Sequence, residues 1–395
     1  MKWNSFWIVV LAVTMALPAS VLARDGGRNF LIHNRLRLEY DDNIREADRA
    51  KTSSFKVIEE IEFLVNFNLE NTFVSFRYKP SFVWWDNRSE GSTDLHHDFD
   101  LIFNHEFTPR LSLSVKDTFR YAELPEAIER GTVIRQRSDF LYNQLVGTLG
   151  YRLTPVGRLE VSGRYNLLRY DKSSIARVED YDMYVAGLTY RHTIVAETSV
   201  ALDTRFESIS YDEVNRDAET YQLGIGLEHM FSPNVLGNAR GGYQYKDYDA
   251  DGISSDSEPF AELSMTLMPS PVTRVTFGAS HTLLESDISP YANQERTRLF
   301  ASLAYDVTSR VTWNLAGSYI RSDYDADRAI VELAEEHGVD FGDGSEDIVQ
   351  FSTRLTYRVN RSNWLEAGWQ FTNLDSDLRE DFDRNRFNIG WKTQL

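Results

Sequence analysis

Hydrophobic and polar residues alternate along residues 295–324, which form two runs joined by a short turn at 308–310. In the first run, Leu299 and Leu303 share one face, and Arg296 and Arg298 share the other. Because side chains of a β-strand point alternately to its two faces, this pattern predicts a β-hairpin with one apolar and one polar face. Each arm is longer than ten residues, which is enough to cross a bilayer when the strand is tilted.

The same unit recurs along the whole chain. Eight short turns lie near 71–72, 108–110, 154–157, 193–197, 232–234, 269–271, 308–310 and 360–362. Nine longer, acidic loops lie near 41–54, 86–94, 122–137, 171–179, 211–218, 249–257, 286–294, 324–345 and 375–382. Short turns at one end and long loops at the other are typical of outer-membrane β-barrels, whose short turns face the periplasm. The pattern therefore predicts an all-β protein, a transmembrane antiparallel up-and-down β-barrel of about 18 strands, with 16 as the alternative count.

Two other all-β architectures fit the pattern less well. A β-sandwich has shorter strands and loops of similar length at both ends, and a β-solenoid repeats about every 20 residues with parallel strands. Aromatic residues gather at both ends of the predicted strands, as Tyr40 and Trp84 do beside long loops and Trp313 and Trp391 do beside turns. Two aromatic belts are typical of a barrel that spans a membrane, although aromatic residues also favour strands in general.

The first 23 residues have the parts of a secretory signal peptide. Lys2 is basic, residues 6–17 are apolar, and the segment ends at the small residue Ala23. The apolar run is short and is interrupted by Thr14, which disfavours a transmembrane helix. We therefore expect residues 1–23 to be cleaved during export, and residues 24–395 to form the barrel in the outer membrane of a Gram-negative cell.

The composition excludes several kinds of site and partner for this chain. The chain has no cysteine, which excludes disulfides, thiolate metal sites and a cysteine nucleophile. Its net charge of -18 argues against a nucleic-acid partner. The mean hydropathy is polar, which agrees with a barrel because only alternate residues face lipid.

A short motif, Tyr40-Asp41-Asp42-Asn43, ends the first predicted strand and is followed by the array of hairpins. In this combination the chain resembles the β-barrel porin type 2 family, which includes the EpsL-like outer-membrane proteins of exopolysaccharide operons. The resemblance implies an outer-membrane barrel for polysaccharide export, with polysaccharide and periplasmic export proteins as partners. The resemblance implies no catalytic residues in this chain.

A barrel of this size encloses a water-filled lumen. The pore-lining candidates on the polar face are Arg35, Arg37, Glu262, Arg274, Arg296, Arg298 and Arg354. Mixed charges can orient polar or anionic solutes, whereas charges that pair across strands only fill the interior. Arg296 and Arg298, together with Arg274 from the preceding hairpin, are expected to form a basic strip that suits a polyanionic polysaccharide.

One acidic loop matches the calcium-binding pattern of an EF-hand. Its potential ligands at positions 1, 3, 5 and 12 are Asp247, Asp249, Asp251 and Glu258. Predicted strands flank this loop instead of helices, so a solvated acidic loop without metal is the alternative. No cofactor is required, and Ca²⁺ at this loop is the one cofactor that the sequence suggests. The acidic loops are also expected to bridge outer-membrane lipopolysaccharide through divalent ions.

Two of the long loops contain helix signals, at 124–131 and at 327–338. Their apolar residues need a surface to pack against. Folding inward over the lumen and packing on a neighbouring loop are the two options.

The sequence thus predicts a porin-like channel with no enzymatic activity, and exopolysaccharide is the preferred cargo through the family resemblance. A general diffusion porin and a scaffold barrel without an open pore are the alternatives. A surface hydrolase is the least favoured, since the chain has no G-x-S-x-G or H-E-x-x-H motif. The sole histidine cluster, His96-His97, lies beside Asp94 and Asp98.

Overall fold

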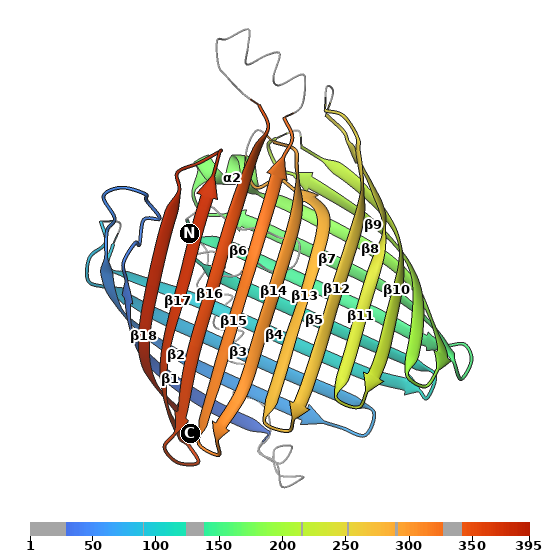
Figure 1. The fold of residues 1–395 in the computed structure, drawn as a ribbon, viewed down its shortest axis with the longest axis horizontal. Coiled ribbons are helices and arrows are strands. Elements are labelled where there is room, and N and C mark those ends of the chain that lie inside the picture. Colours follow the sequence, from blue (N-terminus) through green and yellow to red (C-terminus); the bar gives the residue numbers. More distant parts are fainter. Residues whose placement is uncertain are drawn as a thin grey trace, which may run out of the picture.

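The computed structural model describes residues 29–89, 91–123, 138–214, 216–250, 253–288, 291–326 and 342–395. In these residues, eighteen strands form one closed sheet (Figure 1). The strands are β1 (Phe30–Asp41), β2 (Ser54–Asn68), β3 (Thr72–Trp85), β4 (Thr93–Thr108), β5 (Leu111–Ala122), β6 (Phe140–Arg152), β7 (Gly157–Tyr170), β8 (Tyr181–Val195), β9 (Thr198–Tyr211), β10 (Ala218–Ser232), β11 (Val235–Tyr248), β12 (Asp256–Ser270), β13 (Thr273–Glu285), β14 (Asn293–Thr308), β15 (Val311–Tyr324), β16 (Gly344–Arg358), β17 (Asn363–Ser376) and β18 (Phe382–Gln394). Helix α2 (Ser173–Glu179) lies between β7 and β8.

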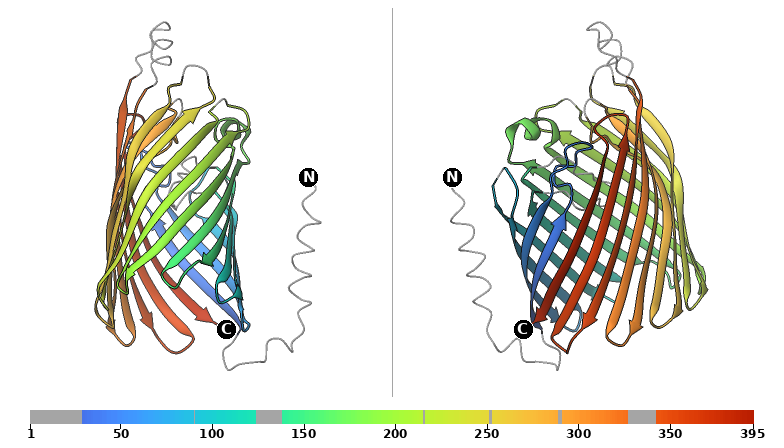
Figure 2. Two further views of the ribbon diagram at one scale, coloured as in Figure 1. Left: turned by 90° about the vertical axis from the view of Figure 1, so that its right-hand side faces the viewer. Right: turned by 60° about the vertical axis from the view of Figure 1, so that its left-hand side comes forward.

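Each strand pairs antiparallel with the next one, and β1 pairs with β18 from His33↔Gln394 to Asp41↔Arg386, which closes the barrel. The strands are tilted, with the short turns gathered at one end and the longer loops and α2 at the other (Figure 2). The predicted fold, strand count and alternation of short turns with long loops are confirmed. Among the described residues, no helix is both long and apolar enough to cross a membrane. The predicted signal peptide and the two predicted loop helices lie outside the described residues.

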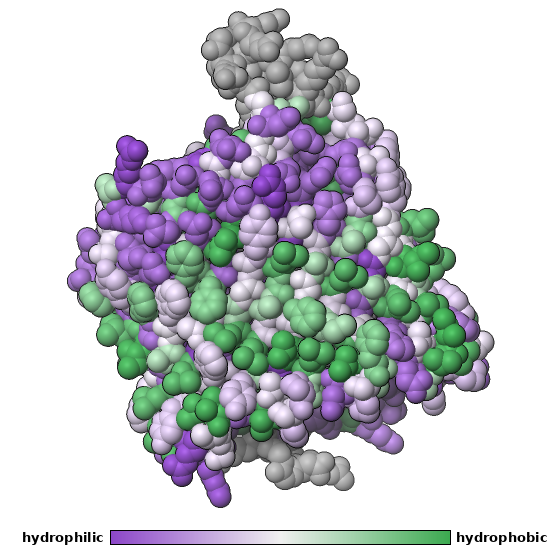
Figure 3. Space-filling view, in the orientation of Figure 1, coloured by the Kyte–Doolittle hydropathy of each residue, from purple (hydrophilic) through white to green (hydrophobic). Residues whose placement is uncertain are grey.

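The two faces of the strands differ as the alternation predicts. On β14, Leu299 on the outer face is 49% exposed, whereas Arg296 on the inner face is 5% exposed. Hydrophobic side chains gather across the middle of the barrel wall, and hydrophilic ones gather toward the end with the long loops (Figure 3). An apolar outer band of this kind matches the hydrocarbon core of a bilayer.

The inner face also carries apolar clusters near the end with the long loops, which the alternation did not predict. We refer to these three clusters together as the inner collar. The residues of the inner collar are Ala122, Phe140, Tyr142, Leu168, Tyr170, Tyr181, Met183, Ile209, Tyr211, Ala218, Tyr248 and Ala292; Ile44, Ile58, Val83 and Trp85; and Ile320, Ile348 and Leu374. Ile175 and Ala176 of α2 and Val214 of the β9–β10 loop pack against the largest cluster. The loops therefore bury an apolar core inside the mouth of the barrel.

The Tyr40–Asn43 motif lies at the seam between the first and last strands. Asp42 accepts hydrogen bonds from the backbone N–H of Asn385 at 2.6 Å and from its side-chain amide at 2.9 Å. The buried amide of Asn43 donates to the carbonyls of Ala47 at 2.8 Å and Asp383 at 2.9 Å. The motif that carried the family resemblance thus has a structural role in closing the barrel.

Candidate functional site

Most charges in the lumen along β1 to β5 are paired. Arg35 lies between two carboxylates, 3.1 Å from that of Glu60 and 2.5 Å from that of Glu366 on β17. Lys79 of β3 and Arg120 of β5 both contact Asp98 of β4, at 2.9 Å and 3.1 Å. These neighbouring strands place opposite charges in register, so this side of the wall has little net charge to offer a solute.

The charges of Arg37 and Glu262 are also paired. Arg37 lies 3.4 Å from Glu60. Glu262 of β12 lies 3.7 Å from Arg240, whose main partner is Asp203 of β9 at 2.6 Å. For these predicted pore-lining residues, the structure favours the alternative in which charges pair across strands.

The wall formed by β13 to β18 is different. Arg274 of β13 pairs with Ala304, Ala304 with Asn314, and Asn314 with Arg354 of β16, so one row of the sheet carries an arginine at each end. With neighbouring strands about 4.8 Å apart, the two arginine backbones are separated by about 14 Å. Neither arginine forms an ion pair with another described residue. Within the described chain, Arg274 donates a hydrogen bond to the sulfur of Met268 at 3.9 Å, and the charges around Arg354 are those of Arg35, Arg37, Glu366 and Glu60.

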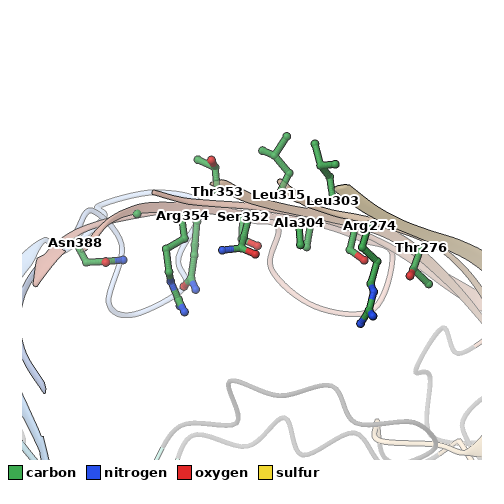
Figure 4. Close-up of a pocket in the computed structure, with 14 residues that line it drawn as sticks. Arg274, Thr276, Leu303, Ala304, Leu315, Ser352, Thr353, Arg354 and Asn388 are labelled. Carbon is green, nitrogen blue, oxygen red and sulfur yellow. The ribbon is translucent and has the colours of Figure 1, made fainter. Parts of the chain in front are cut away.

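A cavity of about 330 Å³ lies against this wall between the two arginines. Small or polar inner-face side chains line it: Thr276, Ser302, Ala304, Asn314, Ala316, Ser352, Gly368, Gln370 and Asn388. Arg274, Arg354 and Asn388 project to the inner side of the sheet, whereas Leu303, Leu315 and Thr353 point to the other side (Figure 4). The cavity is therefore a recess in the lumen wall that is lined mostly by small and polar residues, with a guanidinium at either end.

Small residues keep this recess open. A Cβ at Gly368 would lie 2.9 Å from Nδ2 of Asn388, so a larger residue there would displace that amide from its present position. Ala304 and Ala316 likewise leave space in front of the sheet. No motif in the sequence marks these residues. Their polar or small character at alternate positions was visible, but their alignment across six strands depends on the register.

The predicted strip of Arg274, Arg296 and Arg298 is arranged differently from a continuous basic surface. Arg296 is buried, and it donates to Gln294 at 2.7 Å and to Ser322 at 3.3 Å. The guanidinium of Arg298 lies 5.2 Å from the ring centre of Phe300. Of the three, only Arg274 borders the cavity, where its counterpart is Arg354.

The calcium-like loop is only partly described, because Asp251 lies outside the described residues. Glu258 pairs with Gln244 in the ladder between β11 and β12. Asp247 lies three positions beyond Gln244, so its side chain belongs to the opposite face of the sheet. Calcium binding at Asp247, Asp249, Asp251 and Glu258 stays a prediction.

One group of possible metal ligands occurs in the described part of the chain, formed by Asp94, His96 and Glu123. Its carboxylates already have a cation. Arg88 contacts Asp94 and Glu123, each at 2.5 Å. A metal ion at this place would have to compete with the Arg88 guanidinium, so the group is accounted for as an ion-pair network.

The histidine cluster considered for a hydrolase is divided between the two faces of β4. His96 pairs with Ser81 and His97 with Pro80, so adjacent residues point to opposite sides. His97 forms a hydrogen bond with the hydroxyl of Tyr78 at 2.9 Å. The two histidines do not combine into a catalytic pair.

Comparisons with known proteins agree with the barrel. The family described as "Putative beta-barrel porin 2" matches residues 29–395. The chain is similar in fold to OccK1 (OpdK) of Pseudomonas aeruginosa, with 11% identity, coverage of 93% of this chain and 99% of the other, and a TM-score of 0.52. It is also similar to OccK9 (OpdG) of the same organism, with 12% identity, 93% and 99% coverage and a TM-score of 0.51, and to P. aeruginosa OpdK solved with vanillate, with 11% identity, 93% and 99% coverage and a TM-score of 0.51. No curated protein is significantly similar to the chain.

Proposed function

Because the chain belongs to the family described as "Putative beta-barrel porin 2", we propose that its barrel passes negatively charged saccharides, exopolysaccharide among them, along the wall between Arg274 and Arg354. The protein is a porin-like β-barrel of the outer membrane, and the chemistry of the lumen wall decides which solutes such a barrel favours.

The recess between the two arginines is the observation that carries the proposal. A guanidinium presents a planar fork of donors that matches a carboxylate, and neither Arg274 nor Arg354 is occupied by an acidic residue of the described chain. Between them, the hydroxyls of Ser302 and Ser352 and the amide of Asn314 offer donors and acceptors to sugar hydroxyl groups. The wall therefore offers acidic sugars both charge attraction and hydrogen bonds.

The position of the recess in the lumen wall also favours transport of a bound solute over its retention. The arginines at both ends of the recess project to the inner side of the sheet (Figure 4), so the recess faces the lumen and a bound group can leave along the barrel axis. Conduction requires binding that is favourable enough for entry and weak enough for release. An extended acidic polymer could move past such a wall one sugar at a time, which supports exopolysaccharide as cargo.

A small organic carboxylate is the second candidate. OpdK, which shares the fold, was solved with vanillate. Vanillate is an aromatic carboxylate, and a single arginine of the recess would suffice for its carboxylate group. This candidate needs only one end of the recess, whereas an acidic oligosaccharide would use both ends.

Single-channel recording in a planar bilayer tests the proposal. The refolded chain is exposed to acidic oligosaccharides of increasing length, to neutral oligosaccharides of matched length, and to vanillate. Block by acidic oligosaccharides that strengthens up to the length spanning about 14 Å supports the proposal. Equal block by neutral and acidic sugars would contradict it, and block by vanillate alone would favour the second candidate. A folded barrel without conductance would support the scaffold alternative.

Matched variants locate the interaction. Substituting Arg274→Gln together with Arg354→Gln should weaken block by acidic sugars about tenfold or more, since hydrogen bonds to charged groups contribute about 1.5–3 kcal/mol each. Arg164→Gln is the control, because Arg164 faces the lumen from β7 and is paired with Glu207 at 3.0 Å. An equal effect of the control would mean that overall lumen charge, and not the recess, governs binding.

A further inference from the structure

Glu59 places a carboxylate on the outer face of the barrel, within its apolar band. Glu59 of β2 pairs with Leu36 of β1 on one side and with Phe82 of β3 on the other. Residues directly opposite in an antiparallel ladder share a face, and Leu36 and Phe82 are 48% and 46% exposed on the outside. Glu59 is itself exposed, so it faces the surroundings of the barrel and not the lumen.

The position of Glu59 is below the rim of the barrel. Val57 lies two positions from Glu59 along β2, toward the long loops. Beyond Val57, the ring centres of Phe55 and Tyr40 are 5.0 Å apart. Trp391 of β18 pairs with Leu36. It lies near the end of β18 at Gln394, on the side of the short turns. Aromatic residues mark the two membrane interfaces of a barrel, so Glu59 lies between them, at a depth where charged groups are unfavourable.

Glu59 has one hydrogen-bond donor in the described chain. The side-chain amide of Asn34 of β1 donates to Oε1 of Glu59 at 2.9 Å, on the same exposed face. An amide group has two hydrogens and a carboxylate can accept several hydrogen bonds, so both side chains keep capacity that lipid tails cannot satisfy.

A second outward-facing pair shows what a completed arrangement looks like. Asn143 of β6 donates to Asp117 of β5 at 2.8 Å and also to the carbonyl of Thr118 at 3.2 Å. Both hydrogens of this amide are used within one chain, and Asp117 and Asn143 are half-buried. The pair of Asn34 and Glu59 differs because Glu59 is exposed and because the Asn34 amide uses one of its two hydrogens within the described chain.

We infer that the outer face around Asn34 and Glu59 is a contact surface for a second copy of this chain. The patch contains a donor and an acceptor side by side, so it is complementary to itself, as a two-fold contact requires. With the two-fold axis along the membrane normal, Asn34 of each copy donates its second hydrogen to Glu59 of the other. Each carboxylate then accepts two amide hydrogen bonds, and Leu36 and Phe82 of both copies pack around them.

Other occupants fit the patch less well. The anionic phosphates of lipopolysaccharide would meet a carboxylate and no described basic side chain on this part of the outer face. Lipid tails offer no hydrogen bonds. Between membrane-embedded surfaces, polar contacts and close packing decide association because lipid is as apolar as the side chains. A polar pair within an apolar surface is therefore the feature that would direct pairing.

Crosslinking through single cysteines tests the inference, because the chain has no cysteine of its own. The full chain carrying Leu36→Cys is reconstituted at low density in lipid vesicles and oxidised with iodine. The matched control carries Ile225→Cys, which is 67% exposed in the middle of β10, on the opposite side of the eighteen-stranded barrel. We expect covalent dimers with Leu36→Cys, at several times the yield of Ile225→Cys. Equal yields at the two positions would overturn the inference.

Further measurements distinguish loss of the contact between two copies from misfolding of the barrel. Adding Asn34→Leu and Glu59→Leu to the Leu36→Cys chain should lower crosslinking to the level of the Ile225→Cys control, while conductance per barrel stays unchanged. Unchanged crosslinking in this folded variant would overturn the inference. Native mass spectrometry of the unmodified chain should show dimers, and a monomer would overturn it too. A crosslink in native outer membranes that joins Leu36→Cys only to a different protein would also overturn the inference.

Discussion

Arg384 of the last strand holds the carboxylate of Asp41 of the first strand through two parallel hydrogen bonds. Nε of Arg384 lies 3.0 Å from Oδ1 of Asp41, and Nη2 lies 2.5 Å from Oδ2. Both side chains are buried, and Lys56 of β2 contacts the same carboxylate at 2.9 Å. No turn connects β1 to β18, so this pair adds to the backbone ladder and to the hydrogen bonds of Asp42 and Asn43 in joining the two strands.

Breaking this pair should destabilise the closed barrel. We expect Asp41→Asn to lower the free energy of unfolding by about 3–5 kcal/mol, because it removes the buried charge that Arg384 and Lys56 share and leaves Arg384 with the more exposed Glu46 as its acidic partner. Urea unfolding in vesicles, followed by tryptophan fluorescence, measures the change. Arg321→Gln is the control. Its ion pairs with Asp323 and Asp347 are exposed at the surface, so the loss should stay below about 1 kcal/mol. Similar losses in both variants would show that the seam pair has no special role.

Reversing one charge of the recess should change ion selectivity. A unit charge about 7 Å from a passing ion contributes about 0.6 kcal/mol in water, with opposite signs for an anion and a cation, so each charge changes the anion-to-cation permeability ratio about sevenfold. We expect Arg354→Glu to shift the reversal potential in a KCl gradient toward cation selectivity, by more than Arg354→Gln does. The shift should shrink in concentrated salt, because screening shortens the range of the charge. A reversal potential that does not respond to either variant would place the conducting path elsewhere in the lumen.

The loop helix α2 should loosen as the pH rises. Burial raises the pKa of Glu179 to about 7; the nearby carboxylates of Asp287 and Asp180 reinforce the increase, and Arg216 opposes it. The packed state thus binds a proton more tightly than the unfolded loop, whose Glu has a pKa of about 4.5. Its stability is greatest below that value and falls as the pH rises toward 7.

Trypsin cleavage at Arg177, an exposed residue of α2, measures this loosening. Cleavage between about pH 6 and about pH 8, normalised to a free peptide of the same sequence, should accelerate several-fold, since one pKa unit corresponds to a factor of ten. Glu179→Gln should remove the pH dependence. A variant that keeps the full dependence would assign it to another group.

Truncating the inner collar should cost more than truncating the outer face of the same strand. Phe140 of β6 is 1% exposed at the centre of the largest cluster, whereas Leu145 faces outward and is 42% exposed. Phe140→Ala should lower the free energy of unfolding by about 3–5 kcal/mol because it leaves a cavity. Leu145→Ala, which opens no enclosed cavity, should cost less. Single-channel current noise should increase in Phe140→Ala alone if the collar holds the loops in place.

The alternation of residues along the chain was sufficient to determine the barrel. Period-two patterning is a local property, so Leu299 outside and Arg296 inside follow from the sequence alone, as do the positions of the turns and the long loops; the strand count was predicted as about 18 with 16 as the alternative, and the structure has eighteen. The acidic motif at Asp41 was also visible as a motif. Its partner was not, because Arg384 lies 343 positions away along the chain.

Only the tertiary structure decided which inner-face residues meet. The register between strands pairs Arg35 with Glu366 and leaves Arg274 and Arg354 at the two ends of a recess. It also places Glu59 beside Asn34 on the outer face. A pattern along one strand determines the face of each residue but not its neighbours on other strands. Those neighbours depend on how all eighteen strands align when the sheet closes on itself.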